Sequence, residues 1–335
     1  VMVHSEAEIQ VLASLEKARL EGTPTDRKSL NDSAERFWVF AEDYSPAYTS
    51  LLSHGLVDGD EDEYRLTAKG LPLAGEYHRQ RPDHYYYYYQ KFYQAARASE
   101  AHSELCRRVF GEDLCQEGQA DMTSLKDLIA ALNLKPGEHV LDLGCGAGVI
   151  AEYIAEVSGT SVTGIDYSAP AINEANERTA DRNTQLTFAV GDMNDLNLPD
   201  KSLDAVISLD TLYWAADLEA TLSALKRALR PGGLMGIFMN HHIDEGEDKE
   251  RLRPEHSKAW KALSNLDLSF ETTDYTQAIG EFWRRNAEAA SDLREAFEAE
   301  GNGFIAESLL RESIDDYLPD VEAGRISRYL YLVQC

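Results

Sequence analysis

From about residue 120 onward, short apolar runs alternate with stretches whose apolar residues recur at helical spacing. Five runs are strand candidates: His139–Leu143, Ser161–Ile165, Leu186–Val190, Leu203–Ser208 and Leu234–Met239. Strands that alternate with helices predict a parallel sheet with helices on both faces. Right-handed crossovers bring the carboxyl ends of such strands to one edge, where open α/β sheets bind their ligands. We therefore expect an α/β domain over residues 120–335 with its site at that edge.

Two further strand candidates lie nearer the C-terminus, at Leu268–Thr272 and Ile326–Val333. Between them, residues from about 275 to 318 have a helical pattern. We expect this stretch to be a helical insertion that precedes the last strand of the sheet.

Residues 5–75 predict short helices followed by a compact hairpin. Apolar helical spacing occurs in Ile9–Leu15 and Phe37–Phe40, and strand-like alternation in Tyr64–Gly70 follows the acidic turn Asp58–Glu63. This order resembles the helix-and-wing end of a winged-helix module. Residues 1–75 hold 7 Lys and Arg against 14 Asp and Glu, whereas a DNA-binding wing would place basic side chains on phosphates. The charge balance therefore favours an element for dimerisation and for covering an active site.

Residues 76–119 are the expected link between these two parts. One long helix is predicted over 76–110, and it contains five consecutive tyrosines, Tyr85–Tyr89. Five in a row cover every face of a helix, so some would be buried while others reach solvent, a partner or a pocket. We place Tyr88 and Tyr93 at a substrate pocket. Packing between domains is the other interpretation.

The composition is that of a folded globular protein with a large acidic surplus. The 335 residues are 43% hydrophobic and carry a formal net charge of −27. No apolar run approaches the ~20 residues of a membrane span, and the negative field disfavours nucleic-acid and membrane-surface partners. The four cysteines have no Cys-x-x-Cys or metal-ligand spacing. We expect a reduced cytoplasmic protein without a metal site.

The segment Val140–Gly148 places glycines at positions 144, 146 and 148, directly after a strand and before a helix. Such glycines let the backbone turn sharply and approach a ligand closely. The Gly-x-Gly-x-x-Gly spacing of nicotinamide folds fails, because Val149 stands at its last position. Asp142 would repel a pyrophosphate and suits a cationic ligand instead.

Acids also stand at the ends of the next two strands. A carboxylate after the second strand matches the cis-diol of a ribose, and Asp166 stands there. After the third strand, Asp192 would accept from an exocyclic amine while Met193 packs on a purine ring. Together with Asp142, these residues describe a pocket for a positively charged adenosine without phosphate.

These residues, in this order and spacing, resemble the class I S-adenosylmethionine-dependent methyltransferases over about residues 120–240. Ser208–Trp214 and Leu229–Gly233 fit the same pattern, and Val109–Gly118 resembles the segment that closes over the cofactor in phosphobase-type methyltransferases. The resemblance implies a Rossmann-like seven-stranded α/β sheet, S-adenosylmethionine as cofactor and a small molecule as substrate. It implies cofactor contacts from Gln116, Asp142, Gly144, Cys145, Gly146, Asp166, Tyr167, Asp192, Met193 and Leu209.

Methyl transfer is an in-line displacement, for which a protein mainly holds nucleophile, methyl group and sulfur in line. Related small-molecule methyltransferases tend to carry a histidine about four residues beyond the position of Asp210, and here Trp214 stands there after Tyr213. Two aromatic rings at this place fit a thioether or amine acceptor, whose cationic product they would stabilise. Other candidate bases are His102, His241, His242 and Tyr213 itself.

We therefore expect a cytoplasmic homodimer that methylates a thioether sulfur or an amine of a small molecule, for example a methylthio acid. Trp283 and Arg284 in the insertion are further expected substrate contacts, the arginine for a carboxylate. An O-methyltransferase with a base other than the usual histidine is the first alternative. A winged-helix DNA-binding regulator that senses S-adenosylmethionine is the second.

Overall fold

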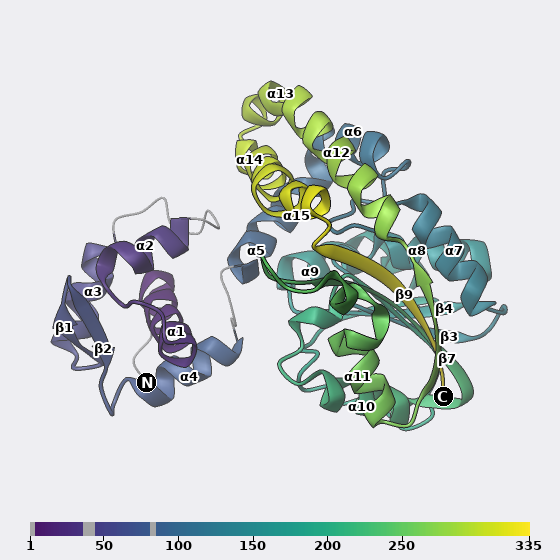
Figure 1. Ribbon diagram of the computed structural model, residues 1–335, viewed down its shortest axis with the longest axis horizontal. Helices are drawn as coiled ribbons and strands as arrows, with labels where there is room; N and C mark the ends of the chain where they lie inside the picture. The colour runs from purple at the N-terminus through teal and green to yellow at the C-terminus, as the bar shows by residue number, and fades with distance from the viewer. Residues whose placement is uncertain (1–3, 36–43, 81–84) are drawn as a thin grey trace. The chain divides into compact units, whose positions relative to one another are not determined.

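A computed structural model of the chain describes residues 4–35, 44–80 and 85–335. They form two compact units, one ending at Phe92 and one running from Tyr93 to Cys335. Figure 1 shows the elements of each unit. The helical spacing noted at Phe37–Phe40 lies outside the described residues.

The N-terminal unit consists of helices and one hairpin. Its elements are α1 (Glu6–Glu21), α2 (Arg27–Glu35), α3 (Ser45–Ser53), β1 (Val57–Asp60), β2 (Glu63–Leu66) and α4 (Leu71–Gln80). The expected hairpin is present, since β1 and β2 pair antiparallel up to the acidic turn. Leu12 of α1 and Ala74 of α4 lie in one buried core. Helix α4, which crosses the boundary expected at residue 75, therefore belongs to this unit.

The prediction of a single helix over residues 76–110 is wrong. After α4 the chain forms α5 (Tyr85–Ala95), a 3-10 turn (Ala96–Ala98) and α6 (Glu100–Val109). Ser99 separates the last two, because its backbone is extended and its hydroxyl accepts a hydrogen bond from the amide of His102 at 3.0 Å. A serine in this conformation caps the helix that follows it and interrupts the one before.

One seven-stranded sheet in the order β5-β4-β3-β6-β7-β9-β8 forms the centre of the C-terminal unit. Its strands are β3 (His139–Leu143), β4 (Ser161–Asp166), β5 (Leu186–Val190), β6 (Leu203–Leu209), β7 (Leu229–His242), β8 (Ser269–Asp274) and β9 (Ile326–Gln334). β3 to β7 pair in parallel as predicted. β9 runs antiparallel to both of its neighbours, so the sheet is mixed rather than wholly parallel. By lying between β7 and β8, β9 satisfies the backbone hydrogen-bonding groups of both strands.

Helices cover both faces of this sheet (Figure 1). One face carries α7 (Met122–Leu132), α8 (Val149–Ser158) and α9 (Ala169–Arg178), and the other carries α10 (Leu218–Ala228) and α11 (Lys258–Asn265). Along β6, Ile207 is buried against the first set of helices and Val206 against the second. Successive strand residues point to opposite faces, which explains the uninterrupted apolar runs. The predicted Rossmann-like fold, with a mainly helical N-terminal unit, is confirmed.

The helices expected between residues 275 and 318 are present and continue to Ala323. They are α12 (Thr276–Asp292), α13 (Arg294–Ala299), α14 (Gly303–Arg311), a π-helical turn (Glu312–Tyr317) and α15 (Leu318–Ala323). They lie beside α6 and lead into the start of β9 (Figure 1). In the part of the chain that the structure describes, no helix combines the length and the apolar character needed to cross a membrane.

Candidate active site

The turn from β3 into α8 contains three glycines in the left-handed backbone region, Gly144, Gly146 and Gly148 (φ 81°, 51° and 73°). A Cβ atom on Gly144 would lie 2.3 Å from a side-chain carbon of Thr211. A Cβ atom on Gly146 would lie 2.3 Å from the hydroxyl of Tyr93. Both the backbone angles and these close approaches require glycine, so the loop leaves its peptide groups accessible to a ligand.

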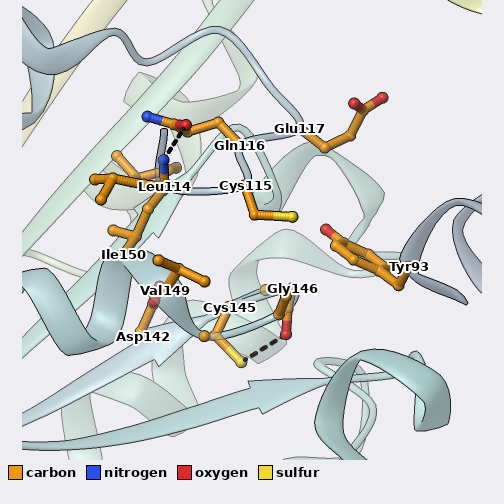
Figure 2. A pocket seen from close by; sticks show the side chains of 14 residues that line it. Tyr93, Leu114, Cys115, Gln116, Glu117, Asp142, Cys145, Gly146, Val149 and Ile150 are labelled. Atoms are coloured by element: carbon orange, nitrogen blue, oxygen red, sulfur yellow. Dashed lines mark hydrogen bonds between the residues drawn. The ribbon is translucent and has the colours of Figure 1, made fainter. Parts of the chain in front are cut away.

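A cavity opens beside this loop, at the carboxyl end of β3 (Figure 2). It is lined by Tyr93, Leu114, Cys115, Gln116, Glu117, Asp142, Gly144, Cys145, Gly146, Ala147, Gly148, Val149, Ile150 and Leu209. Half of these are predicted site residues: Tyr93, Gln116, Asp142, Gly144, Cys145, Gly146 and Leu209. The remaining lining residues adjoin the predicted ones in sequence. The structure thus brings the closing segment, the glycine loop and the end of β6 together.

Two buried acids stand at the ends of β3 and β4. Asp142 lines the cavity, and its carboxylate accepts no hydrogen bond within the described residues. Burial, with Asp166 nearby, raises the pKa of Asp142 to about 7. Asp166 accepts hydrogen bonds from the amides of Gly146 at 2.9 Å and Ser168 at 2.8 Å, and burial raises its pKa as well. A cation bound here would favour the ionised form of both acids, so the site suits a positively charged ligand.

Residues 114–117 form the wall opposite the glycine loop (Figure 2). The side-chain oxygen of Gln116 accepts a hydrogen bond from the amide of Leu114 at 2.8 Å, which folds the segment back on itself. Cys115 has a left-handed φ of 50°, and its thiol points toward Tyr93 (Figure 2). Burial raises the pKa of the Cys115 thiol to about 12, so it stays protonated and serves as a wall of the cavity.

Comparison with known proteins agrees with this geometry. Residues 140–233 match a family model described as a methyltransferase domain. Phosphoethanolamine N-methyltransferase 1 of Zea mays is 38% identical over 126 residues, which are 38% of this chain and 25% of that protein. The 27-O-demethylrifamycin SV methyltransferase of Amycolatopsis mediterranei is 32% identical over 223 residues, which are 58% of this chain and 81% of that protein. This chain belongs to the class I S-adenosylmethionine-dependent methyltransferases.

S-adenosylmethionine is accordingly the cofactor of this methyltransferase. Among solved structures, phosphoethanolamine N-methyltransferase 2 of Haemonchus contortus, in complex with phosphomonomethylethanolamine and S-adenosylhomocysteine, matches with a TM-score of 0.60. It is 20% identical, and the match covers 73% of this chain and 60% of that one, so the likeness shows the fold alone. The chain spans about a quarter of the length of the phosphoethanolamine N-methyltransferases of Zea mays and Arabidopsis thaliana that it matches.

Four residues predicted to contact the adenosine lie outside the cavity lining, and the first is Asp166, whose carboxylate instead holds the amides of Gly146 and Ser168. Tyr167 follows Asp166 and is half-buried. Asp192 is exposed, and its carboxylate accepts hydrogen bonds from the backbone and side-chain amides of Asn194, both at 2.8 Å. Met193 packs against the sheet face that α10 covers. Their roles as cofactor contacts stay predictions.

The histidines considered as bases do not line the cavity. His102 is 1% exposed, and burial lowers its pKa to about 4. A ring nitrogen of His241 lies 2.6 Å from the carbonyl oxygen of Arg251, and burial lowers the pKa of this ring as well. A ring nitrogen of His242 lies 3.1 Å from the carboxylate of Asp320. Each ring is thus either buried in the core or paired with another group.

Tyr213 and Trp214 follow β6 in a 3-10 turn, Leu212–Trp214. Their ring centroids lie 5.2 Å apart. Tyr213 is 40% exposed, and partial desolvation with Tyr317 nearby raises the pKa of its hydroxyl well above the ordinary value. The Tyr213 hydroxyl therefore stays protonated at neutral pH and is suited to donate a hydrogen bond rather than to act as a base.

Trp283 lies in an aromatic cluster at the same end of the sheet. Its ring stacks on Tyr317, with centroids 4.0 Å apart and planes at 14°. The rings of His242 and Tyr317 make a T-shaped contact, with centroids 5.7 Å apart. Trp283 is 3% exposed, and within the described residues its indole N–H has no hydrogen-bond partner. An unpaired buried donor costs free energy unless a ligand accepts from it.

The other two predicted substrate contacts are placed differently. Arg284 is exposed, and its guanidinium lies back along its own helix beside Gly280. Tyr88 belongs to the N-terminal unit, where it is 2% exposed and its ring stacks near Phe92 at 5.8 Å. Their substrate roles stay predictions.

Sequence reasoning missed a buried ion pair between Asp210, after β6, and Arg328 on β9. Both side chains are 2% exposed, and the guanidinium donates to both carboxylate oxygens, once at 2.9 Å. The Arg328 guanidinium also donates to the side-chain oxygen of Asn240 at 3.0 Å. The signal was available, because a charged residue inside the apolar run Ile326–Val333 predicts a buried partner of opposite charge.

Proposed function

We propose that this chain transfers a methyl group from S-adenosylmethionine to a small-molecule acceptor bound at the carboxyl edge of the sheet. The observation that carries the proposal is the cavity beside the glycine loop, where no cationic side chain among residues 4–35, 44–80 and 85–335 pairs with the buried Asp142. The left-handed glycines and the paired acids at the ends of β3 and β4 fit a cationic nucleoside without phosphate. The cofactor supplies an activated methyl group on a sulfonium.

Each wall of the cavity has a proposed task, and so does Asp166, which lies outside the lining and holds the amide of Gly146. Asp166 holds the ribose hydroxyls, and Asp142 faces the cationic methionine portion. Gln116 and Cys115 close the opposite wall, while Tyr93 covers Gly146. These contacts hold the cofactor in one orientation, which is the main contribution that a protein makes to an in-line displacement.

We further propose that the acceptor is an amine or a thioether, placed near Tyr213 and Trp214. Support comes from the protonation of the Tyr213 hydroxyl and from the histidines, which are buried or paired. A nucleophile with a free lone pair needs no base, and the exposed ring of Tyr213 is available for a cation–π contact with the product. The names of the relatives leave the acceptor atom open, since they include N- and sterol 24-C-methyltransferases.

An oxygen acceptor is the second candidate. The observation that favours it is the 32% identity to an enzyme named for 27-O-demethylrifamycin SV, across 81% of that protein. A base other than the usual histidine would then remove the hydroxyl proton.

We propose that the N-terminal unit serves dimerisation and covers the site of a cytoplasmic enzyme. The tip of its hairpin is acidic, with exposed Asp60, Glu61 and Asp62. Phosphate would be repelled by such a tip. A mobility-shift assay at low salt should therefore show no DNA binding, and binding that weakens steeply with salt would favour the regulator instead.

The identity of the acceptor atom is tested by measuring the release of S-adenosylhomocysteine with panels of amines, thioethers and phenols. We expect turnover with amines or thioethers. We also expect that Trp214→His does not raise the rate of turnover with phenols. Turnover confined to phenols would support the oxygen acceptor. So would a rate with phenols that Trp214→His increases.

A further inference from the structure

The partners of the Asp210–Arg328 ion pair reach two different parts of the site. Gln119, just beyond the closing segment, donates its backbone amide to the Asp210 carboxylate at 3.0 Å. Its side-chain oxygen accepts from the side-chain amide of Asn240 at 2.7 Å. Its side-chain amide donates to the Tyr317 hydroxyl at 3.0 Å. One buried glutamine thus bonds to the ion pair, to β7 and to the π-helical turn.

On one side, Gln119 continues directly from the wall of the cofactor cavity. Residues 114–117 line that cavity, and only Gly118 separates them from Gln119. Gly118 has a φ of 144°, and a Cβ atom on it would lie 3.6 Å from the Asp210 carboxylate. Gly118 therefore lies beside Asp210, and the hydrogen bond from the Gln119 amide links the end of the closing segment to the same carboxylate, so a shift of the wall moves Gln119.

On the other side, Gln119 reaches the aromatic cluster through Tyr317. This residue ends the π-helical turn Glu312–Tyr317, whose i to i+5 bonding is uncommon and often found at functional sites. Ser313 holds the turn, since its hydroxyl donates to the Leu309 carbonyl at 2.6 Å and accepts from Asn286 at 3.1 Å. Tyr317 in turn stacks on Trp283.

We propose that Gln119 is a positioning residue that transmits cofactor binding to the Tyr317–Trp283 pair. The inference rests on the proposed function. When the cofactor fills the cavity and fixes the closing segment, Gln119 fixes the Tyr317 hydroxyl and with it the aromatic pair. The acceptor then meets an ordered aromatic surface only after the cofactor is bound.

Hydrogen exchange with S-adenosylhomocysteine as the probe tests this coupling. In the wild-type chain we expect the probe to slow amide exchange both at residues 113–118 and at residues 312–317. Gln119→Ala keeps the backbone bond to Asp210 but loses the side-chain bonds. It should retain the slowing at 113–118, lose the slowing at 312–317, and weaken binding by about 2- to 10-fold, as expected for one or two hydrogen bonds.

Two further variants keep the test decisive. Tyr317→Phe removes one hydroxyl and should uncouple the turn in the same way. Gln185→Ala is the control, because the half-buried Gln185 also makes two side-chain hydrogen bonds, donating to two carbonyls at 3.3 and 3.2 Å, away from the site. This control should retain the slowing in both segments.

The outcomes separate the two proposals. Calorimetry that detects no binding of the probe to the wild-type chain overturns both the coupling and the proposed function. Binding without slower exchange at 312–317, or slowing that persists in Gln119→Ala and Tyr317→Phe, overturns the coupling alone.

Discussion

The two halves of the sheet edge bury carboxylates in opposite ways. At the ends of β3 and β4, Asp142 and Asp166 lie in the interior, paired with no cationic side chain of the described residues, and burial raises the pKa of both. At the end of β6, Asp210 is equally buried but is bound by the Arg328 guanidinium through both oxygens. A buried acid with its own cation depends on that cation, since removal of one partner leaves an uncompensated charge in the interior, whereas acids without one are available to a cationic ligand.

This contrast predicts different results when each half is changed. Variants at the end of β6, where Asp210 is paired, should affect the free energy of unfolding most. Variants at the ends of β3 and β4, where Asp142 and Asp166 are unpaired, should affect ligand binding and its dependence on pH.

The largest effect on stability is expected for Arg328→Met, which leaves Asp210 charged and buried without its cationic partner. We expect a loss of about 3–5 kcal/mol in the free energy of unfolding, measured by urea denaturation. Arg285→Met is the matched control, because Arg285 is half-exposed and pairs with Asp121 at 3.0 Å. That change should cost no more than about 1 kcal/mol. Equal losses in the two variants would remove the contrast on which this account rests.

A large effect on binding is expected for Gly146→Ala, since a methyl group there meets the Tyr93 hydroxyl in the ligand cavity. Displacing that side chain should weaken binding of S-adenosylhomocysteine by roughly 100-fold, if the shift costs about 3 kcal/mol. Gly137→Ala imposes a similar left-handed strain where no atom lies within 4 Å of the added carbon. Weak binding by both variants would assign the effect to general strain.

Asp142→Asn should change how stability depends on pH. In the ligand-free wild type, the pKa of Asp142 is raised from 3.8 to about 7. The stability contributed by its proton is therefore fully present below pH 4 and is lost as the pH rises through about 7. The variant lacks this loss and should be more stable at pH 8, by up to about 4 kcal/mol.

The same variant should change the pH profile of binding. Affinity of the wild type for S-adenosylhomocysteine should rise as Asp142 ionises near pH 7, and Asp142→Asn should bind weakly with a flat profile. Calorimetric titrations and urea denaturation at pH 5, 6, 7 and 8 measure both effects. Identical profiles for the two proteins would contradict a role for Asp142 as the unpaired acid.

The smallest effect is expected for Asp192→Ala. The carboxylate is exposed and already accepts two hydrogen bonds from Asn194, so solvent would compensate for much of its loss. Affinity for S-adenosylhomocysteine should fall by no more than about 10-fold, as for a single hydrogen bond. Abolished binding would show that the cofactor lies closer to β5 than the cavity lining indicates.

Sequence predicted the half of the site that depends on local order along the chain. Asp142, Asp166 and the glycine loop follow strand ends that the apolar runs mark, and the parallel topology brings them together. The Asp210, Gln119 and Arg328 network escaped prediction because its members lie 91 to 209 residues apart along the chain. Pattern alone does not say which distant side chains will meet in the interior.

The direction of a side chain on a helix could not be predicted where the start of the helix was unknown. His102 follows the break at Ser99, and the register of α6 turns it into the core. Arg284 stands one position after Trp283, and successive helix positions differ by about 100°. The tryptophan therefore faces inward while the arginine reaches solvent.

Calorimetric titration with S-adenosylhomocysteine at pH 8, of the wild type beside Asp166→Ala, tests the central claim most directly. The account predicts saturable binding at one site in the wild type. It also predicts binding weaker by about 10- to 100-fold in the variant, which loses charge-assisted hydrogen bonds. No heat from the wild type, or equal affinity in both proteins, would contradict the assignment of this edge of the sheet to the cofactor.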